Sequence, residues 1–208
     1  YRPLYQKDIP IRKKTLSIQW NHQFTLPNNG ISELLETNYF LDYQGVRFIA
    51  LNSNVMIDEQ MEWLETVLKN NPHKWTIAFF HHPLYSATTK RDYPERRKRW
   101  KPLFDKYGVD LALQGHDHTY ARGSEVMYEK NLLTGTNIKD ATGTVYVVSV
   151  SGPKQYDIKP SWNQYEATRH KAGADKQLFQ VISIDGNKLS YLSLIHISEP
   201  TRQAEISY

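Results

Sequence analysis

Two short apolar runs in the middle of the chain each end in histidines, and this pattern constrains the fold more than any other feature. The run Trp75–Phe80 leads into His81-His82-Pro83, and the run Val109–Leu113 leads, after one glutamine, into Gly115-His116-Asp117-His118. Runs of this length and β-rich content predict buried strands. Ligands of open α/β sheets bind beyond the carboxyl ends of the strands. We therefore expect a histidine-rich site at that edge of a sheet.

The spacing inside the second motif favours metal binding. Residues i and i+2 of an extended segment face the same side, about 7 Å apart. His116 and His118 are then expected to point toward one ion, or toward two ions about 3.5–4 Å apart, as in two-metal hydrolases. By the same period Asp117 points away from both histidines, so we do not predict it as a ligand.

These motifs carry a family resemblance. Phe80-His81-His82-Pro83 followed by Gly115-His116-Asp117-His118 resembles the last two metal-binding motifs of the calcineurin-like metallophosphoesterases. The extension His118-Thr119-Tyr120-Ala121-Arg122 and the later Ser151-Gly152-Pro153-Lys154 are similar to the purple acid phosphatase branch. The resemblance covers roughly residues 20–191. It implies an α/β fold in which two packed mixed β-sheets are flanked by helices, an αββα sandwich.

The resemblance also implies roles for the histidines. His81 and His116 would share one metal ion, and His118 would reach a second. His82 would contact a substrate phosphate or orient a ligand, with simple exposure as the alternative. We expect two divalent or trivalent ions, with Fe, Zn and Mn all compatible with a mixed site.

Two further residues, Tyr120 and Arg122, resemble positions at which the purple acid phosphatases carry similar side chains. We expect them to support the site by packing or by contacting ligands or substrate. The implied activity is hydrolysis of a small-molecule phosphate ester, with phosphomonoesters as the first substrate class and phosphodiesters as the second.

The family pattern is incomplete in this sequence. Its earlier motifs, Asp-x-His, Gly-Asp-x-x-Asp (or Tyr) and Gly-Asn-His-Glu, are absent, and with them the bridging carboxylate. Asn21-His22 invites comparison with the third motif, but Trp20 and Gln23 replace its glycine and glutamate. It is either a ligand or acid, or part of a loop near the site. We expect residues 1–193 to be the C-terminal part of a catalytic domain whose N-terminal part is missing, inactive alone. A degenerate, non-catalytic domain is the alternative.

The end of the chain needs a separate interpretation. The stretch Ser193–Arg202 resembles the peptide produced when a sequencing adapter is translated. We therefore expect residues 194–208 to be a non-native tail in which His196 has no function. A native strand followed by a polar tail is the alternative.

Charge and composition exclude some classes of function. The net charge of +4 and a basic cluster between residues 90 and 101 suit an anionic ligand or a solvated surface. Nucleic-acid binding is disfavoured, because the aromatic residues nearby, including Trp100 and Phe104, fit a buried helix face instead of an exposed stacking surface. No apolar run is long enough to span a membrane, and the absence of cysteine excludes disulfides. The resemblance favours a secreted or periplasmic protein.

Pattern alone predicts the remaining elements. A strand, helix, strand, helix, strand alternation from Val46 to Leu113 indicates an α/β core. The expected elements are a hairpin over 38–51, a helix over 59–69 with Asp58 as N-cap, a helix ended by Gly108, a strand over 144–150 and a last hairpin over 179–192 at an antiparallel edge. The segments 123–142 and 156–176 are expected to be irregular, with His170 as a weak site candidate.

Overall fold

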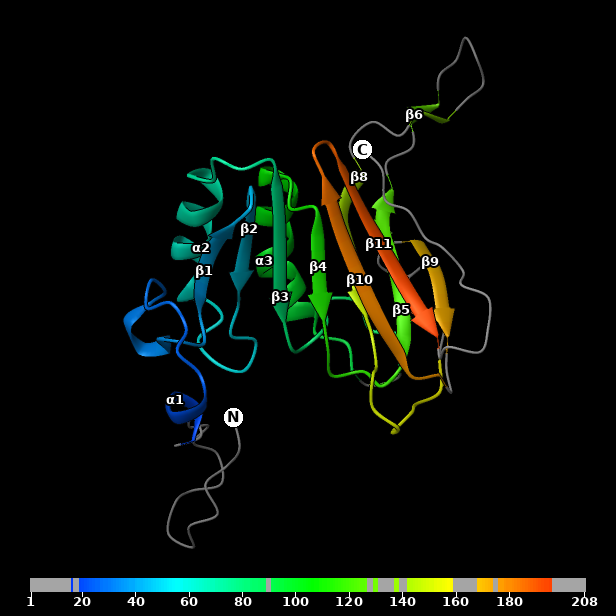
Figure 1. Ribbon diagram of the computed structural model, residues 1–208, viewed down its shortest axis with the longest axis horizontal. Helices are drawn as coiled ribbons and strands as arrows, with labels where there is room; N and C mark the ends of the chain where they lie inside the picture. Colours follow the sequence, from blue (N-terminus) through cyan, green and yellow to red (C-terminus); the bar gives the residue numbers. More distant parts are fainter. Residues whose placement is uncertain are drawn as a thin grey trace, which may run out of the picture.

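A computed structural model describes residues 16, 19–88, 91–126, 129–130, 137–138, 142–158, 168–173 and 176–195. Figure 1 shows their arrangement. The elements in chain order are α1 (Trp20–Gln23), the 3₁₀ helix η1 (Ser32–Leu34), β1 (Tyr39–Tyr43), β2 (Val46–Ala50), α2 (Gln60–Lys69), β3 (Trp75–Phe80), α3 (Pro94–Tyr107), β4 (Leu111–Gln114), β5 (Tyr120–Val126), β6 (Glu129–Lys130), β7 (Asn137–Ile138), β8 (Thr142–Val148), β9 (Thr168–Gly173), β10 (Leu178–Asp185) and β11 (Lys188–Ile195).

The main sheet has seven strands in the order β1-β2-β3-β4-β8-β5-β9. Its centre is parallel, with β2, β3, β4 and β8 running in one direction. The strands at both margins, β1 on one side and β5 and β9 on the other, pair antiparallel. Because the central strands are parallel, their carboxyl ends meet at one edge of the sheet.

Alternation along the central strands divides the core into two layers. On β3, Ala78 and Phe80 pack with α2 and α3, which lie behind the sheet in Figure 1. Trp75 and Ile77 point to the other face, where they pack with β10 and β11. Parallel strands are normally buried on both faces, and this division shows why the predicted strands are nearly continuous in apolar residues.

The β10–β11 hairpin forms a second, two-stranded sheet that crosses the front of the main sheet. Leu189 and Tyr191 of β11 are fully buried against the main sheet. The expected α/β architecture of two packed sheets with flanking helices is confirmed. The hairpin was expected at an antiparallel edge of the sheet. That position is wrong, because its apolar side packs onto the face of the sheet.

Several predicted local features are confirmed, and one is not. Strand β3 has the predicted bounds, and the last residue of α3, Tyr107, is followed by the predicted helix-ending Gly108, whose φ of 65° is left-handed. Helix α2 begins at Gln60. Asp58 is not its N-cap, since the helix has no side-chain cap and the Asp58 carboxylate binds Arg99 instead.

The segments expected to be irregular contain strands. β5 runs to Val126, inside the stretch predicted as a polar loop, and β9 lies within the segment 156–176. Both strands are polar and pair antiparallel with each other at the margin of the sheet. Their polar sequences do not show the alternating apolar pattern that predicts a strand, because backbone pairing at the margin does not require an apolar side chain on every second residue.

Part of the expected non-native tail lies in a strand. β11 continues through Ile195, so Leu194 and Ile195 pair with Phe179 and Leu178 of β10. Residues 196–208, including His196, lie outside the described residues. The boundary proposed at residue 194 stays a prediction.

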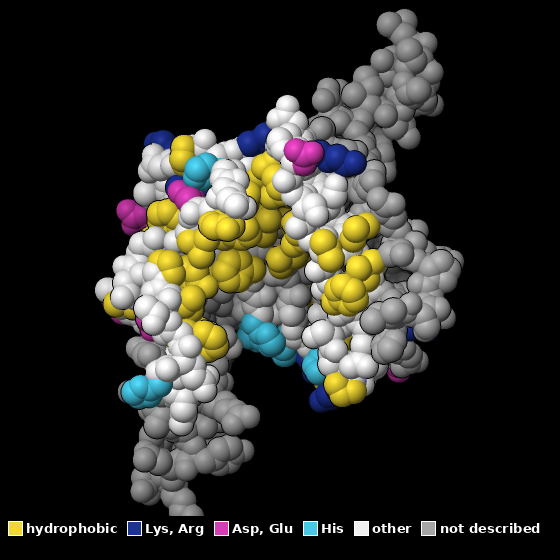
Figure 2. All heavy atoms as spheres, in the orientation of Figure 1, with side chains coloured by type: hydrophobic (Ala, Val, Ile, Leu, Met, Phe, Trp, Pro, Cys, Tyr) yellow, Lys and Arg dark blue, Asp and Glu magenta, His cyan; other side chains and the backbone are white. Residues whose placement is uncertain are grey.

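An open apolar hollow lies beside the β10–β11 hairpin. It has a volume of about 610 Å³, and Figure 2 shows hydrophobic side chains gathered there, with histidines at the lower rim. Its lining includes Trp20 of α1, Phe79 of β3, Leu113 of β4 and also His81. The second sheet leaves this part of the main sheet uncovered among the described residues. Within that part of the chain, no helix combines the length and apolar character needed to cross a bilayer.

Candidate metal site

Three parallel strands deliver polar side chains to one edge of the sheet. Ser53 follows β2, His81 and His82 follow β3, and His116 follows β4. Neighbouring pairing of β2, β3 and β4 brings these chain segments together. The predicted location of the site, at strand ends, is where the structure places these histidines.

Three imidazoles form a compact group at this edge. The Nε2 atom of His81 lies 3.0 Å from the Nδ1 atom of His116. His82 completes the group, and one nitrogen from each of the three rings lies within 4.8 Å of the others. This cluster of His81, His82 and His116 is hereafter the histidine cluster. Nitrogens so close together suit a shared ion, since an imidazole binds zinc at about 2.0–2.1 Å.

Electrostatics favour the neutral form of two of the three rings. Partial burial, with a smaller effect from the nearby Arg91 guanidinium, lowers the pKa of His116 to about 4. Burial also lowers the pKa of His81 below its ordinary value. A histidine must be neutral to bind a metal ion, so both rings are in the ligating form at neutral pH.

The outer nitrogens of two cluster rings have hydroxyl partners. Nε2 of His116 lies 2.9 Å from the Tyr93 hydroxyl, and Nδ1 of His82 lies 3.0 Å from Ser53 Oγ. Ser53 Oγ also accepts the backbone N–H of His82 at 2.9 Å. Metal-binding histidines typically donate their second ring nitrogen to such a partner, which fixes the tautomer and the ring orientation. The donor set therefore fits a metal ion.

His118 lies apart from the histidine cluster. Its ring packs on Tyr156 with centroids 4.6 Å apart, and its Nδ1 donates to the Lys154 carbonyl at 2.9 Å. This bond leaves Nε2 as the nitrogen with a free lone pair. The structure thus brings together His81 and His116 as the resemblance implied, adds His82 beside them, and puts His118 in a neighbouring position.

The loop that carries His116 differs from the extended segment assumed from sequence. His116 has a φ of 69°, and the Asp117 N–H donates to the Gly115 carbonyl at 2.8 Å. This is a γ-turn centred on His116, a strained conformation for a residue with a side chain. The i, i+2 argument for His116 and His118 is therefore wrong, because the segment turns between them. Asp117 is buried, and its carboxylate binds Ser86 and Ala87.

The basic cluster serves mainly as structural support. Arg97 pairs with Asp92 at 2.7 Å, and Lys101 pairs with Asp105 at 2.5 Å. Arg96 donates to the Ser53 carbonyl at 2.7 Å. Arg91 lies closest to the site, donating to the His116 carbonyl at 2.9 Å and to the Tyr156 hydroxyl at 3.1 Å. The basic cluster is visible in the sequence, whereas the contacts of Tyr93 and Ser53 with the histidines are not, since only tertiary structure brings them together.

The remaining candidates lie elsewhere. Tyr120 is buried in the core layer beneath the β10–β11 hairpin, where it acts in packing, and Arg122 lies further along the same strand, β5. His22 is exposed on α1, while the Asn21 side chain lies outside the described residues. The same is true of the His170 side chain. The histidine cluster contains no carboxylate among the described residues.

Comparison with known proteins agrees with these observations. The sequence model of the calcineurin-like phosphoesterases matches residues 4–120. Purple acid phosphatase 15 of Arabidopsis thaliana is 28% identical over 156 residues, which cover 71% of this chain and 28% of that protein. Acid phosphatase type 7 of Homo sapiens is 30% identical over 154 residues, covering 64% and 33% respectively.

A solved structure shares the fold. The purple acid phosphatase PPD1 from yellow lupin seeds superposes with a TM-score of 0.63 at 20% identity, covering 86% of this chain and 33% of that one. The chain thus spans about a third of the length of these relatives. The match of the family model over more than half of the chain carries the assignment: the chain belongs to the calcineurin-like phosphoesterase family.

Proposed function

We propose that this protein takes part in metal-dependent hydrolysis of small-molecule phosphate esters, with phosphomonoesters as the first substrate class and phosphodiesters as the second. The observation that carries the proposal is the 3.0 Å approach of His81 Nε2 and His116 Nδ1 at the ends of two adjacent parallel strands. Family membership supports the reaction class, and this pair of nitrogens is suited to binding the metal ion that the reaction requires.

In this proposal His81 and His116 bind one metal ion, and His118 reaches a second through its Nε2. A bound metal ion supplies Lewis acidity and lowers the pKa of a water molecule. The protein's own contribution is to hold neutral imidazoles in position and to present His82 beside them. His82 is held by Ser53, and in this proposal its ring faces a ligand or an anionic oxygen. Fe, Zn and Mn all suit such a site once carboxylates complete it.

The carboxylates must come from outside the histidine cluster, since the described residues contribute none to it. We propose that residues 1–193 are the C-terminal part of a catalytic domain, and that a preceding part supplies the bridging carboxylate and the remaining ligands. Residues 194–208 lie outside this proposed domain. On this proposal the chain alone hydrolyses no phosphate ester. The resemblance to the purple acid phosphatases supports a secreted or periplasmic location for the parent protein. Fractionation of cells that express the parent protein tests this location.

The test uses the full-length gene product and this chain side by side. An aryl phosphomonoester and an aryl phosphodiester are assayed with and without a chelator. The full-length protein is expected to hydrolyse the monoester and to lose this activity when chelator is added. The full-length His81→Ala variant is expected to be inactive without chelator. Activity unchanged by chelator or by His81→Ala contradicts the metal site. Hydrolysis by the present chain alone contradicts the proposed division of the domain.

A non-catalytic, degenerate domain is the second candidate. The missing motifs favour it, since three imidazoles without a carboxylate are a poor site for two cations. Full-length protein that binds no metal and hydrolyses neither ester would establish it. Nucleic-acid binding through Arg96–Arg99 has less support, because Arg96, Arg97 and Arg99 already bind protein groups.

A further inference from the structure

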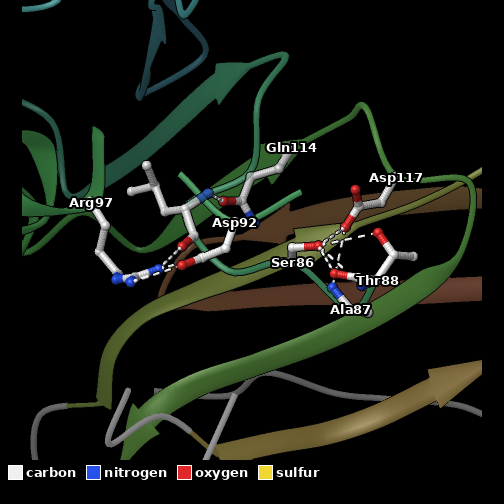
Figure 3. Close-up of polar contacts among 8 residues, drawn as sticks. Ser86, Ala87, Thr88, Asp92, Arg97, Gln114 and Asp117 are labelled. Atoms are coloured by element: carbon white, nitrogen blue, oxygen red, sulfur yellow. Dashed lines mark hydrogen bonds and ion pairs between the residues drawn. The ribbon is translucent and has the colours of Figure 1, made fainter. Parts of the chain in front are cut away.

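The γ-turn at His116 raises the question of what holds it. A side-chain-bearing residue at a φ of 69° is unfavourable, and such strain persists only where the surroundings over-determine the backbone. The residue that follows, Asp117, is 2% exposed and lies in a network with the loop after His81-His82-Pro83. Figure 3 shows this network.

Asp117 binds that loop at two points through one oxygen. Its Oδ2 accepts the Ser86 hydroxyl at 2.6 Å and the Ala87 backbone N–H at 3.1 Å. Ser86 is itself fixed, since its Oγ accepts the Thr88 N–H at 3.0 Å. Ser86, Ala87 and Thr88 are all buried. A carboxylate in this position accepts charge-assisted hydrogen bonds that water does not compete for.

Two other bonds join the same pair of loops. The Leu84 N–H donates to Gln114 Oε1 at 2.5 Å, and the Gly115 N–H donates to the His81 carbonyl at 3.0 Å. Gln114 precedes the γ-turn, Gly115 is the first residue of the turn, and Asp117 is the last. The turn at His116 is therefore bracketed, with Gly115 tied on one side and Asp117 on the other.

We propose that Asp117 is a positioning residue: its buried carboxylate, bound to Ser86 and Ala87, holds the γ-turn that aims the His116 imidazole at His81. The inference deepens the proposed function and rests on it. It also gives the aspartate of the Gly-His-Asp-His motif a task in which it touches neither metal ion nor substrate. Loss of Asp117 should release His116 from the turn and separate the two nitrogens.

The test compares Asp117→Ala with two matched variants of this chain. Asp117→Asn keeps one acceptor oxygen at the position that binds Ser86 and Ala87, while Oδ1, which has no partner among the described residues, becomes the amide nitrogen. Asp110→Ala removes another aspartate that accepts a backbone N–H, that of Thr76 at 2.7 Å, at the opposite end of β4. It controls for the general loss of a partly buried aspartate that accepts a backbone hydrogen bond.

The first readout is amide hydrogen exchange in the metal-free chain. Asp117→Ala is expected to raise exchange at residues 85–88 and 115–119 by at least about tenfold, the effect of losing one hydrogen bond to a charged group. Asp117→Asn should stay near the wild-type rates, and Asp110→Ala should act around Thr76. Unchanged rates in Asp117→Ala, or the same uniform increase in both alanine variants, overturn the proposal.

The second readout is the Zn²⁺ dissociation constant, measured by competition with a chelating dye. Asp117→Ala should weaken binding about 10- to 100-fold, the range for a residue that orients a ligand, with Asp117→Asn near wild type. Equal affinities in all variants overturn the proposal. If Asp117→Ala does not fold, Ser86→Ala removes the 2.6 Å bond from the other side and must raise exchange at 115–119. Wild-type chain that binds no Zn²⁺ contradicts the proposed metal site, while the exchange data still decide the role of Asp117.

Discussion

The Tyr93 hydroxyl lies 2.9 Å from Nε2 of His116, the ring nitrogen that faces away from His81. Tyr93 immediately precedes α3, and Arg96 of that helix packs over its ring, 4.4 Å from the centroid. The tyrosine thus ties the position of α3 to the orientation of a candidate ligand.

Replacing Tyr93 by Phe should weaken metal binding without unfolding the protein. The change removes the hydroxyl partner of His116 but keeps the ring, so the Zn²⁺ dissociation constant should rise about tenfold or more. Dye competition on this chain measures it. Tyr107→Phe is the matched control, since that hydroxyl binds Glu65 on the surface of the helices. Equal effects from the two variants would argue against a role for the Tyr93 hydroxyl.

Histidine substitutions should separate the cluster from His118. His81→Ala and His116→Ala remove the two nitrogens that lie 3.0 Å apart, so Zn²⁺ binding to this chain should be lost. His118→Ala should leave that binding within a few-fold of wild type, because His118 lies apart, against Tyr156. His73→Ala, at a remote histidine whose Nε2 lies 3.3 Å from Asp42, controls for non-specific binding. If His118→Ala lost Zn²⁺ binding as fully as His116→Ala, His118 would be a ligand of the same ion as His81 and His116.

Metal addition and removal should shift stability. Zn²⁺ at 100 times its dissociation constant should stabilise the folded chain by about 2.7 kcal/mol, provided that the unfolded chain does not bind it. Thermal unfolding with Zn²⁺, and again after chelator, measures the shift. His116→Ala should abolish it. A shift that survives this substitution would place the bound ion elsewhere.

Asp110 should make stability depend on pH in an unusual direction. Burial raises its pKa to about 6, opposed by the Thr76 N–H bond. The folded state therefore holds this proton more tightly than the unfolded state, whose pKa is about 3.9. The contribution to stability is full below about pH 4 and is lost as the pH rises through 6.

Asp110→Asn removes this titration. Comparing the variant with the wild type therefore separates the contribution of Asp110 from that of His81 and His116, whose lowered pKa values change stability with pH in the opposite direction. Urea unfolding at pH 4.5 and pH 7 for both proteins gives the comparison. Relative to the variant, the wild type should lose on the order of 1–2 kcal/mol between the two pH values. No difference in pH dependence between the two proteins would show that Asp110 keeps an ordinary pKa.

Trp100 should be a principal determinant of stability. It is fully buried on α3 and contacts Phe80, with ring centroids 5.1 Å apart. Trp100→Ala should cost about 3–5 kcal/mol of unfolding free energy. Trp100→Phe should cost less, since it keeps a ring and removes an indole N–H that has no partner among the described residues. Urea unfolding measures both, and an alanine variant near wild type would contradict this packing.

The sequence by itself determined the central strands, the two main helices and the edge at which the histidines gather. Those features depend on local patterns, namely apolar runs, helical spacing and Gly108 as a helix end, and each pattern acts within a few residues. The family resemblance likewise rested on short motifs, and the comparisons bear it out. The polar strands β5 and β9 could not be predicted from local patterns, because they are defined by backbone pairing with distant segments.

Only the tertiary structure decided which side chains meet at the site. Ser53 reaches the histidines from the loop after β2, while Arg91 and Tyr93 reach them from the stretch before α3, and no local pattern encodes such contacts. The γ-turn at His116 was likewise invisible, because a strained backbone is stabilised by bonds to another loop and not by its own sequence. For this reason His82 stands in the cluster with His81 and His116, while His118 lies beside Tyr156.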